Sequence, residues 1–218
     1  MPTNARSSSS AVTRVPRQQR GQKRIDEILD AAATLVEEVG TEGVTVGAIS
    51  ARAGASKGSM YHFFPDRESV LIALVERHVE ALRASLEAER EARTAQAAVG
   101  SADEAVRAFL EPIDAYVHRH PDLTRILREP ANLKRFGDQR SRLSEMVEAH
   151  AAWMLRLRHA AMDAATVNRA AAAMLAIVSG MRSERVLAAA GSLEAVAREM
   201  RRALAAYVES YAPGQPHG

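Results

Sequence analysis

Residues Thr45–Phe64, TVGAISARAGASKGSMYHFF, have the pattern of two short helices joined by a tight turn. Thr45 and Ser56 are residue types that cap helix N-termini, and Gly54 lies where the chain must turn between the two segments. The second segment opens with small residues and a lysine, so its first turn can approach phosphates and base edges closely. This layout is that of a helix-turn-helix unit, whose second short helix enters the major groove of DNA.

The segments on both sides of this unit are also helical in pattern. Apolar residues recur every three or four positions before it, as expected of an amphipathic helix that ends at Gly40: Ile25, Ile28, Leu29, Ala32, Leu35, Val36 and Val39. After Pro65, Asp66 is placed to cap a long helix that reaches the nineties. One face of that helix is apolar except for a histidine: Val70, Leu71, Leu74, Val75, His78, Val79 and Leu82.

A second helical set follows a weakly patterned stretch at 94–100. Ser101–Glu104 is a capping-box pattern that predicts a helix ending at His120-Pro121. Further helices are expected over 123–128, 139–159, 166–190 and 193–211, the last two separated by Gly191-Ser192. The fold class is therefore all-α: an N-terminal three-helix helix-turn-helix DNA-binding domain and a larger C-terminal helical domain. The expected division is a disordered basic arm at 1–22, the helix-turn-helix domain at 23–68, the C-terminal domain at 69–212 and a disordered tail at 213–218.

Positive charge is concentrated at the N-terminus. The first 25 residues contain six arginines and lysines and no acid, which leaves 23 basic against 27 acidic residues in the rest of the chain. Two interpretations stay open: a solubilising disordered leader, or an arm that binds an anionic polymer such as DNA. The absence of a run of about 18 apolar residues predicts that nothing spans a membrane, and a soluble cytoplasmic protein is expected.

An enzyme is the function class that the sequence disfavours. With no cysteine there is no disulfide, thiolate metal site or cysteine nucleophile. The stretch GASKGS lacks the spacing of a phosphate-binding P-loop and follows no strand. His118 and His120 are two positions apart and point to different helix faces, so no metal is expected, and no cofactor is expected either.

Taken together, residues 24–82 resemble the TetR family of transcriptional regulators. The features that match are a glycine ending the first helix, a threonine starting the second, an Ala-Gly turn, a small-residue start to the third helix, a Tyr-x-x-Phe signature and a basic residue opening the fourth. Here these are Gly40, Thr45, Ala53-Gly54, Ser56–Ser59, Tyr61–Phe64 and Arg67. The family often has lysine where this chain has Arg67, which preserves the charge.

The resemblance implies roles for individual residues in DNA binding. Thr45, Tyr61 and Arg67 are expected to contact phosphates, whereas Phe64 is expected to pack in the core. Arg52 is equally consistent with a phosphate contact and with a solvated surface arginine. Candidates for contacts to base edges or neighbouring phosphates are Ser56, Lys57, Gly58, Ser59 and His62.

For the C-terminal half, the resemblance implies a small-molecule site and a homodimer formed by the last two helices. The dimer would present two recognition helices to a palindromic operator, most often as a repressor. Aromatic, methionine and other apolar side chains are the expected lining of a pocket for an apolar effector, although they could equally be ordinary core: Phe109, Ile113, Tyr116, His150, Trp153, Met154, Met174, Ile177 and Met181. The alternative is an all-helical carrier or interaction protein for apolar ligands that does not bind DNA.

Overall fold

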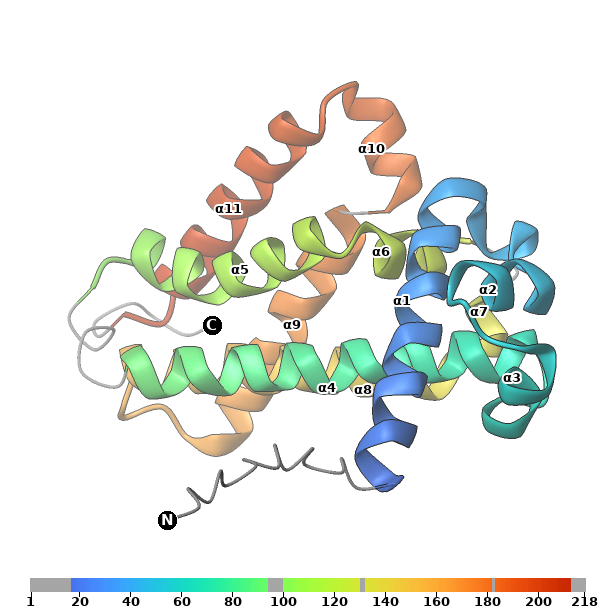
Figure 1. Ribbon diagram of the computed structural model, residues 1–218. Coiled ribbons are helices and arrows are strands. Elements are labelled where there is room, and N and C mark those ends of the chain that lie inside the picture. Colours follow the sequence, from blue (N-terminus) through green and yellow to red (C-terminus); the bar gives the residue numbers. More distant parts are fainter. Residues whose placement is uncertain (1–16, 94–99, 130–131, 182, 213–218) are drawn as a thin grey trace, which may run out of the picture.

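The computed structural model describes residues 17–93, 100–129, 132–181 and 183–212. Across these residues the chain is helical with no β-strand, which confirms the all-α prediction. Figure 1 shows α1, α2 and α3 at one end of the molecule, with the long helices α4 and α5 running side by side away from them. The predictions for the segments 1–16 and 213–218 lie outside the described residues.

The N-terminal helices follow their sequence signals closely. α1 (Arg17–Gly43) is interrupted at Gly40, whose φ of 74° is a conformation that favours glycine. α2 (Val46–Arg52) and α3 (Lys57–Phe63) are joined by a turn in which Gly54 has φ 58°. Ile49 of α2 and Met60 of α3 are fully buried and attach both short helices to α1 and α4.

The remaining helices build the larger part of the molecule. α4 (Arg67–Arg93) is followed by α5 (Ala102–Arg119), which begins with the predicted capping box of Ser101 and Glu104. The elements after the break at His120 are α6 (Pro121–Arg128), α7 (Asn132–Arg135), α8 (Gly137–Arg158), α9 (Ala164–Met181), α10 (Glu184–Ala190) and α11 (Leu193–Glu209). α8 packs on α4, α5 and α9, and α11 packs on α5 and α9, while α6 lies against α1.

Several expected boundaries differ from the structure. Helix α1 begins at Arg17, so residues 17–22 of the expected arm are helical. The helix expected over 166–190 is two helices, because α9 ends at Met181 and α10 begins at Glu184. The four-residue helix α7 was not predicted, since one helical turn carries too few residues to show a period.

Val39 was expected on the apolar face of the first helix, but it is 51% exposed. It lies in the last regular turn before the break at Gly40, and its side chain turns toward Gly43. A Cβ on Gly43 would come within 2.8 Å of Val39 Cγ2, so the two residues pack closely at the surface instead of in the core.

One hydrophobic cluster connects the whole molecule. It extends from Ile28 of α1 through α4, α5, α6 and α8 to Val208 of α11. Within the described residues, α9 alone is long and apolar enough to cross a membrane by length and composition. Mostly buried core helices of soluble proteins meet the same criterion; in α9 28% of the segment is buried, including Val167, Ala170 and Met174.

Candidate nucleic-acid interface and effector site

Both short helices of the helix-turn-helix unit are capped as the sequence predicts. Thr45 Oγ1 accepts a hydrogen bond from the Ala48 amide at 3.1 Å, and Ser56 Oγ accepts one from the Ser59 amide at 3.1 Å. Each cap uses one of the N–H groups that a helix start leaves unpaired. Thr45 and Ser56 are themselves exposed, so their hydroxyls remain at the surface of the unit.

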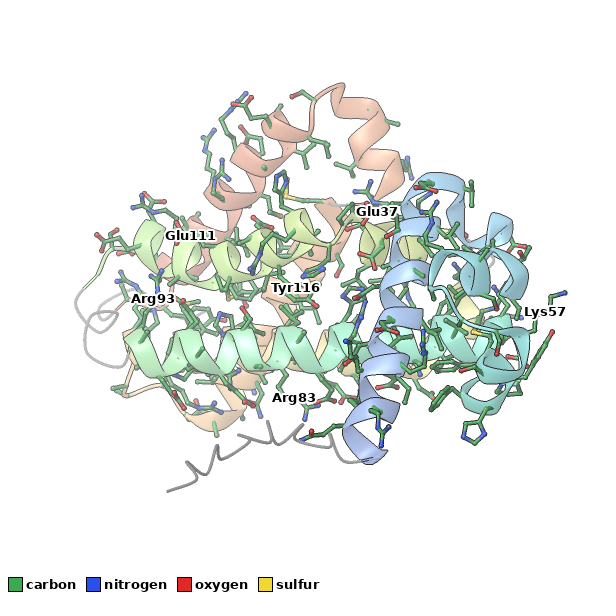
Figure 2. All side chains as sticks on the ribbon, viewed as in Figure 1. Glu37, Lys57, Arg83, Arg93, Glu111 and Tyr116 are labelled. Atoms are coloured by element: carbon green, nitrogen blue, oxygen red, sulfur yellow. The ribbon has the colours of Figure 1, made fainter. Side chains whose placement is uncertain are left out.

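Helix α3 divides cleanly into a buried side and a free side. Met60 is fully buried, Phe64 is 7% exposed, and Phe63 is half-buried. The opposite side presents Lys57, Gly58, Tyr61 and His62 to solvent, with Ser59 half-buried at its edge, and Tyr61 is 56% exposed. Figure 2 shows Lys57 extending away from the body of the protein at the tip of this helix. An exposed tyrosine and lysine on one rigid short helix are suited to reach into a groove of DNA.

Arg67, predicted to contact phosphate, and Arg52, for which a phosphate contact and a solvated arginine were both left open, already have partners within the chain. Arg52 makes a bidentate ion pair with Glu38 of α1, with both N–O distances 2.7 Å. This pair lowers the pKa of the Glu38 carboxyl and raises that of Arg52, mainly through the side-chain hydrogen bonds. Glu38 therefore occupies the face of Arg52 that a phosphate would use.

Arg67, at the start of α4, holds the end of α1 in place. Its Nη1 donates to the carbonyl oxygens of Thr41 and Glu42 at 3.2 and 3.3 Å, and its Nη2 lies 3.9 Å from the Glu42 carboxylate. A cation at the carbonyl end of a helix is favourable because these oxygens have no intrahelical partner. In this conformation the guanidinium is committed to α1, and the predicted phosphate contact stays a prediction.

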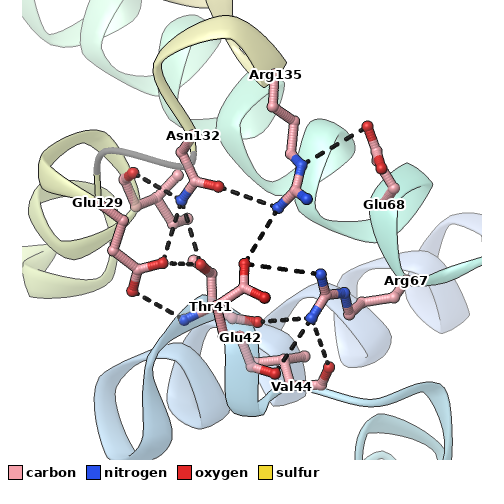
Figure 3. A network of polar contacts seen from close by, with 9 residues as sticks. Thr41, Glu42, Val44, Arg67, Glu68, Glu129, Asn132 and Arg135 are labelled. Carbon is pink, nitrogen blue, oxygen red and sulfur yellow. Dashed lines mark hydrogen bonds and ion pairs between the residues drawn. The ribbon is translucent and has the colours of Figure 1, made fainter.

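A polar network beside Arg67 joins the helix-turn-helix unit to helices α6 and α7 (Figure 3). Glu129, which follows α6, accepts a hydrogen bond from the Thr41 amide at 3.0 Å through Oε1, and its Oε2 contacts the Thr41 hydroxyl. Asn132 Nδ2 donates to Thr41 Oγ1 at 3.2 Å and to the Ile126 carbonyl at 3.0 Å. Thr41 and Asn132 are fully buried, so this network is an internal joint between the two parts of the chain.

Two arginines extend the joint. Arg135 of α7 donates to Asn132 Oδ1 at 3.0 Å and lies 3.7 Å from the carboxylates of both Glu42 and Glu68. Arg125 of α6 donates to the Glu37 carbonyl at 2.6 Å. None of these joint residues was singled out from the sequence, because the partners are about 90 positions apart and no local pattern links them.

A second buried polar cluster joins α4, α5 and α6. His78 Nε2 lies 2.7 Å from Asp122 Oδ2, His78 Nδ1 lies 2.9 Å from the Tyr116 hydroxyl, and all three side chains are at most 3% exposed. Burial works to raise the pKa of Asp122, but the hydrogen bond and charge of His78 prevail, so the pKa is lowered. Burial raises the pKa of Tyr116 to about 12 and lowers that of His120, whose ring lies 4.4 Å from the Tyr116 ring.

Tyr116 was predicted to line the effector pocket, and its hydroxyl is instead engaged in this cluster. Figure 2 shows it between α5 and α4. His78 was visible in the sequence as the one polar residue on the apolar face of the fourth helix, which is the signal that could have identified the cluster.

A stack of three aromatic rings joins α5 to α8: His150 of α8 lies between Phe109 of α5 and Trp153 of α8. The His150 ring lies 6.0 Å from Phe109 and 5.3 Å from Trp153, at interplanar angles of 27° and 19°. The Arg90 guanidinium carbon lies 5.9 Å from the centre of the Trp153 ring. The structure thus brings together three of the predicted pocket residues from α5 and α8, and adds Arg90 from α4.

His150 is fully buried, and neither of its ring nitrogens meets the distance and angle of a well-formed hydrogen bond, although the Ala108 carbonyl lies close enough to act on the ring. Burial lowers its pKa to about 4, although the nearby Ala108 carbonyl and Glu89 carboxylate favour the protonated ring. The imidazole is therefore neutral at pH 7, with one N–H donor and one acceptor nitrogen. The Arg90 Nε is likewise buried without a partner among the described residues.

The other predicted pocket residues lie in the core around this stack. Met154 and Met174 are at most 1% exposed, Ile113 is 7% exposed, and Ile177 and Met181 are half-buried. They lie on α8, α9 and α5, and they belong to the continuous hydrophobic cluster or pack against it.

Two surface grooves flank the larger part of the molecule. One, of about 460 Å³, lies between α4 and α8 and is lined by Leu86, Arg90, Met146 and Ala149, with Glu87 and Glu145 among the polar lining residues. The other, of about 420 Å³, lies between α5 and α11 and is lined mainly by arginines, among them Arg107. No group of three or more metal-binding side chains occurs in the part of the chain that the structure describes.

The arrangement of α2 and α3 defines a helix-turn-helix protein of the DNA-binding regulator class. Residues 28–74 match the family model of bacterial regulatory proteins of the tetR family. The match confirms, for these residues, the resemblance to the TetR family of transcriptional regulators that the sequence predicted.

Known proteins agree with this assignment in sequence and in fold. The nucleoid occlusion factor SlmA of Vibrio vulnificus strain YJ016 is 28% identical over 141 residues, which are 62% of this chain and 68% of SlmA. A TetR-family regulator structure from Mesorhizobium loti has a TM-score of 0.66 at 18% identity and covers 88% of this chain and 96% of its own. The structure of SmeT in complex with triclosan has a TM-score of 0.59 at 20% identity, with 90% and 95% coverage.

Proposed function

We propose that this protein is a ligand-responsive homodimeric repressor that binds a palindromic operator through α3. The observation that carries the proposal is the free side of α3, which presents Lys57, Tyr61 and His62 while Met60 and Phe64 hold the helix in the core. Base edges are read by side chains of this kind on a helix that is fixed in orientation. The cytoplasm is the proposed location, because operator DNA is there.

The proposed dimer forms through α9 and α11. Small or short side chains are exposed along one side of α9, with no large apolar residue among them: Ala165, Asn168, Ala172, Ala176 and Ser179. Ala203 and Ala206 are exposed on the neighbouring α11. Small residues allow helices to approach closely, and a two-fold axis through this surface would form a four-helix bundle.

The proposed effector is a small, largely apolar molecule bound among α4, α5 and α8. The stacked rings of Phe109, His150 and Trp153 support this position, because apolar pockets with a few polar groups are the usual form of small-molecule sites. SmeT, which shares the fold, was solved with triclosan bound. Binding there would release the operator by shifting the dimer between two geometries, and the bond between Thr41 and Glu129 connects the end of α1 to the residue after α6.

The decisive experiment is selection of bound fragments from genomic DNA, followed by mobility-shift assays. The Lys57→Ala/Tyr61→Ala double variant is expected to lose operator binding while keeping its helical content and melting temperature. Arg107→Ala, on the far groove between α5 and α11, is the matched control and should bind as the parent does. Operator binding that survives the double substitution would favour the carrier alternative, and a monomeric mass at micromolar concentration would contradict the dimer.

A second candidate function follows from the relatives named as nucleoid occlusion factors. In that case the protein would act at many chromosomal sites and not at a promoter. Genome-wide mapping of bound sites separates the two: repression predicts a few sites overlapping promoters, whereas a nucleoid role predicts sites scattered without regard to promoters.

A further inference from the structure

Two hydrogen-bond donors at the buried aromatic stack, on His150 and Arg90, lack a well-placed acceptor. A neutral His150 has one N–H, and the Arg90 Nε–H is a second donor; both are buried, and neither makes a well-formed hydrogen bond among the described residues, although the Ala108 carbonyl lies near His150. Leaving such donors unsatisfied is costly in the interior, so an unpaired pair in one place requires an explanation. Both donors flank the same indole, since the His150 ring is 5.3 Å and the Arg90 guanidinium 5.9 Å from the Trp153 ring.

The charge around the stack favours an acceptor that is negative. Arg90 and Arg93 both act on His150 through their positive charges, and Arg93 is already paired with Glu89 and Glu111. Arg90 has no ion-pair partner among the described residues. A guanidinium with a free donor edge beside a neutral imidazole N–H is suited to a carboxylate, which accepts from both.

The shape around the donors favours a flat ligand. The His150 ring is stacked on Phe109 at 27° and on Trp153 at 19°, and a planar ring is the ligand shape that would extend such a stack. The groove of about 460 Å³ between α4 and α8 adjoins the stack: Arg90 both lines the groove and lies over the Trp153 ring, and Ala149, another lining residue, precedes His150 on α8. A volume of this size admits a ligand of one or two fused rings.

We propose that the effector of this regulator is an aromatic carboxylate, whose ring enters the stack at Trp153 and whose carboxylate accepts hydrogen bonds from Arg90 and His150. The inference rests on the proposed function and narrows the effector from an apolar molecule to an aromatic acid. Because Arg90 lines the groove and lies over the indole, it is the side chain that the ring would displace.

The chain offers a direct reporter for the test, because Trp153 is its one tryptophan. Full-length protein labelled with 5-fluorotryptophan is titrated with 2-naphthoate and followed by fluorine NMR and by calorimetry. We expect one resonance that shifts saturably, with the same Kd by both methods. Two probes are the matched ligands: 2-naphthalenemethanol keeps the rings without the charge, and cyclohexanecarboxylate keeps the charge without an aromatic ring. Both are expected to bind at least tenfold more weakly.

Two variants locate the binding. His150→Phe keeps a ring in the stack and removes both nitrogens, and Arg90→Gln removes the charge; each is expected to weaken 2-naphthoate binding at least tenfold while the protein stays folded. Arg107→Gln removes an arginine from the other groove and is expected to leave the Kd unchanged. Equal affinity for the uncharged probe, an unmoved tryptophan resonance, or unchanged binding by the two variants would overturn the proposal.

Operator binding is measured on the same samples so that the two proposals fail separately. If the protein binds its operator but shows no saturable response to 2-naphthoate, only the proposed effector class is refuted. If the protein binds 2-naphthoate at Trp153 but binds no DNA, the proposed repressor function is refuted instead.

Discussion

The substitution His78→Leu is expected to destabilise the protein strongly, because it leaves the Asp122 carboxylate buried without its side-chain partner. Asp122 is 2% exposed, and its Oδ2 lies 2.7 Å from His78 Nε2. Removing one member of a buried ion pair typically costs about 3–5 kcal/mol, since the remaining charge keeps its desolvation penalty. For a protein of this size, that corresponds to a fall in melting temperature of about 6–20 °C.

A double-mutant cycle separates the pair from general packing. Asp122→Leu removes the acid alone, and His78→Leu/Asp122→Leu replaces the whole pair by apolar side chains. Replacing both members of a buried pair is often close to neutral, so the double variant is expected to be at least about 2 kcal/mol more stable than His78→Leu alone. Chemical and thermal unfolding followed by circular dichroism measure all four proteins.

The pH dependence of the free energy of unfolding is an independent test of this reasoning. In the parent, the lowered pKa of Asp122 contributes stability above the ordinary aspartate pKa of about 3.9, and this is lost as pH falls through the lowered folded value. In His78→Leu, burial without a donor would raise that pKa, so acid neutralises the trapped charge. The difference between parent and variant is therefore expected to shrink between pH 7 and pH 4. A loss below about 1 kcal/mol at pH 7, or strictly additive effects in the cycle, would refute this reasoning.

Three further outcomes are expected. Glu38→Gln releases the guanidinium of Arg52 for phosphate, so the slope of log operator affinity against log salt should steepen by about 0.9 in fluorescence anisotropy; an unchanged slope means that Arg52 does not reach DNA. Glu129→Ala leaves the buried Thr41 amide without its acceptor, at about 1–3 kcal/mol, which thermal unfolding should show as a melting temperature lower by about 2–12 °C. Removing residues 1–16 deletes two arginines, and if both contact DNA the salt slope should flatten by about 1.8 for operator and unrelated DNA alike; identical titrations would make the segment a plain leader.

Local signals in the sequence were enough for the helices and their caps. Thr45, Ser56, Asp66 and Ser101 cap the helices they were predicted to cap, because a cap is decided by residues three positions apart. The glycine turns were predictable for the same reason.

The partners of the long polar side chains were not predictable in this way. Arg52 was weighed as a phosphate contact or a solvated arginine, and it pairs with Glu38 on another helix. Arg67 fastens α1 from 25 positions away. His78 and Asp122 are 44 positions apart, and only the packing of α4 against α6 brings them together. Such contacts depend on the tertiary arrangement, whereas a cap or a turn is determined by residues within one short segment.

The path of α4 has a consequence for how the protein unfolds. Its first turns supply Val70, Leu71 and Leu74 to the core that also holds α1, α2 and α3, and its later turns supply Leu82 and Leu86 to the rest of the same cluster. A fragment ending at residue 68 would lack the α4 residues that complete its hydrophobic core, and it should remain unfolded when expressed alone. The DNA-binding end therefore has no separate melting transition: calorimetry of the intact chain should give one cooperative peak, because neither half is complete without the same helix.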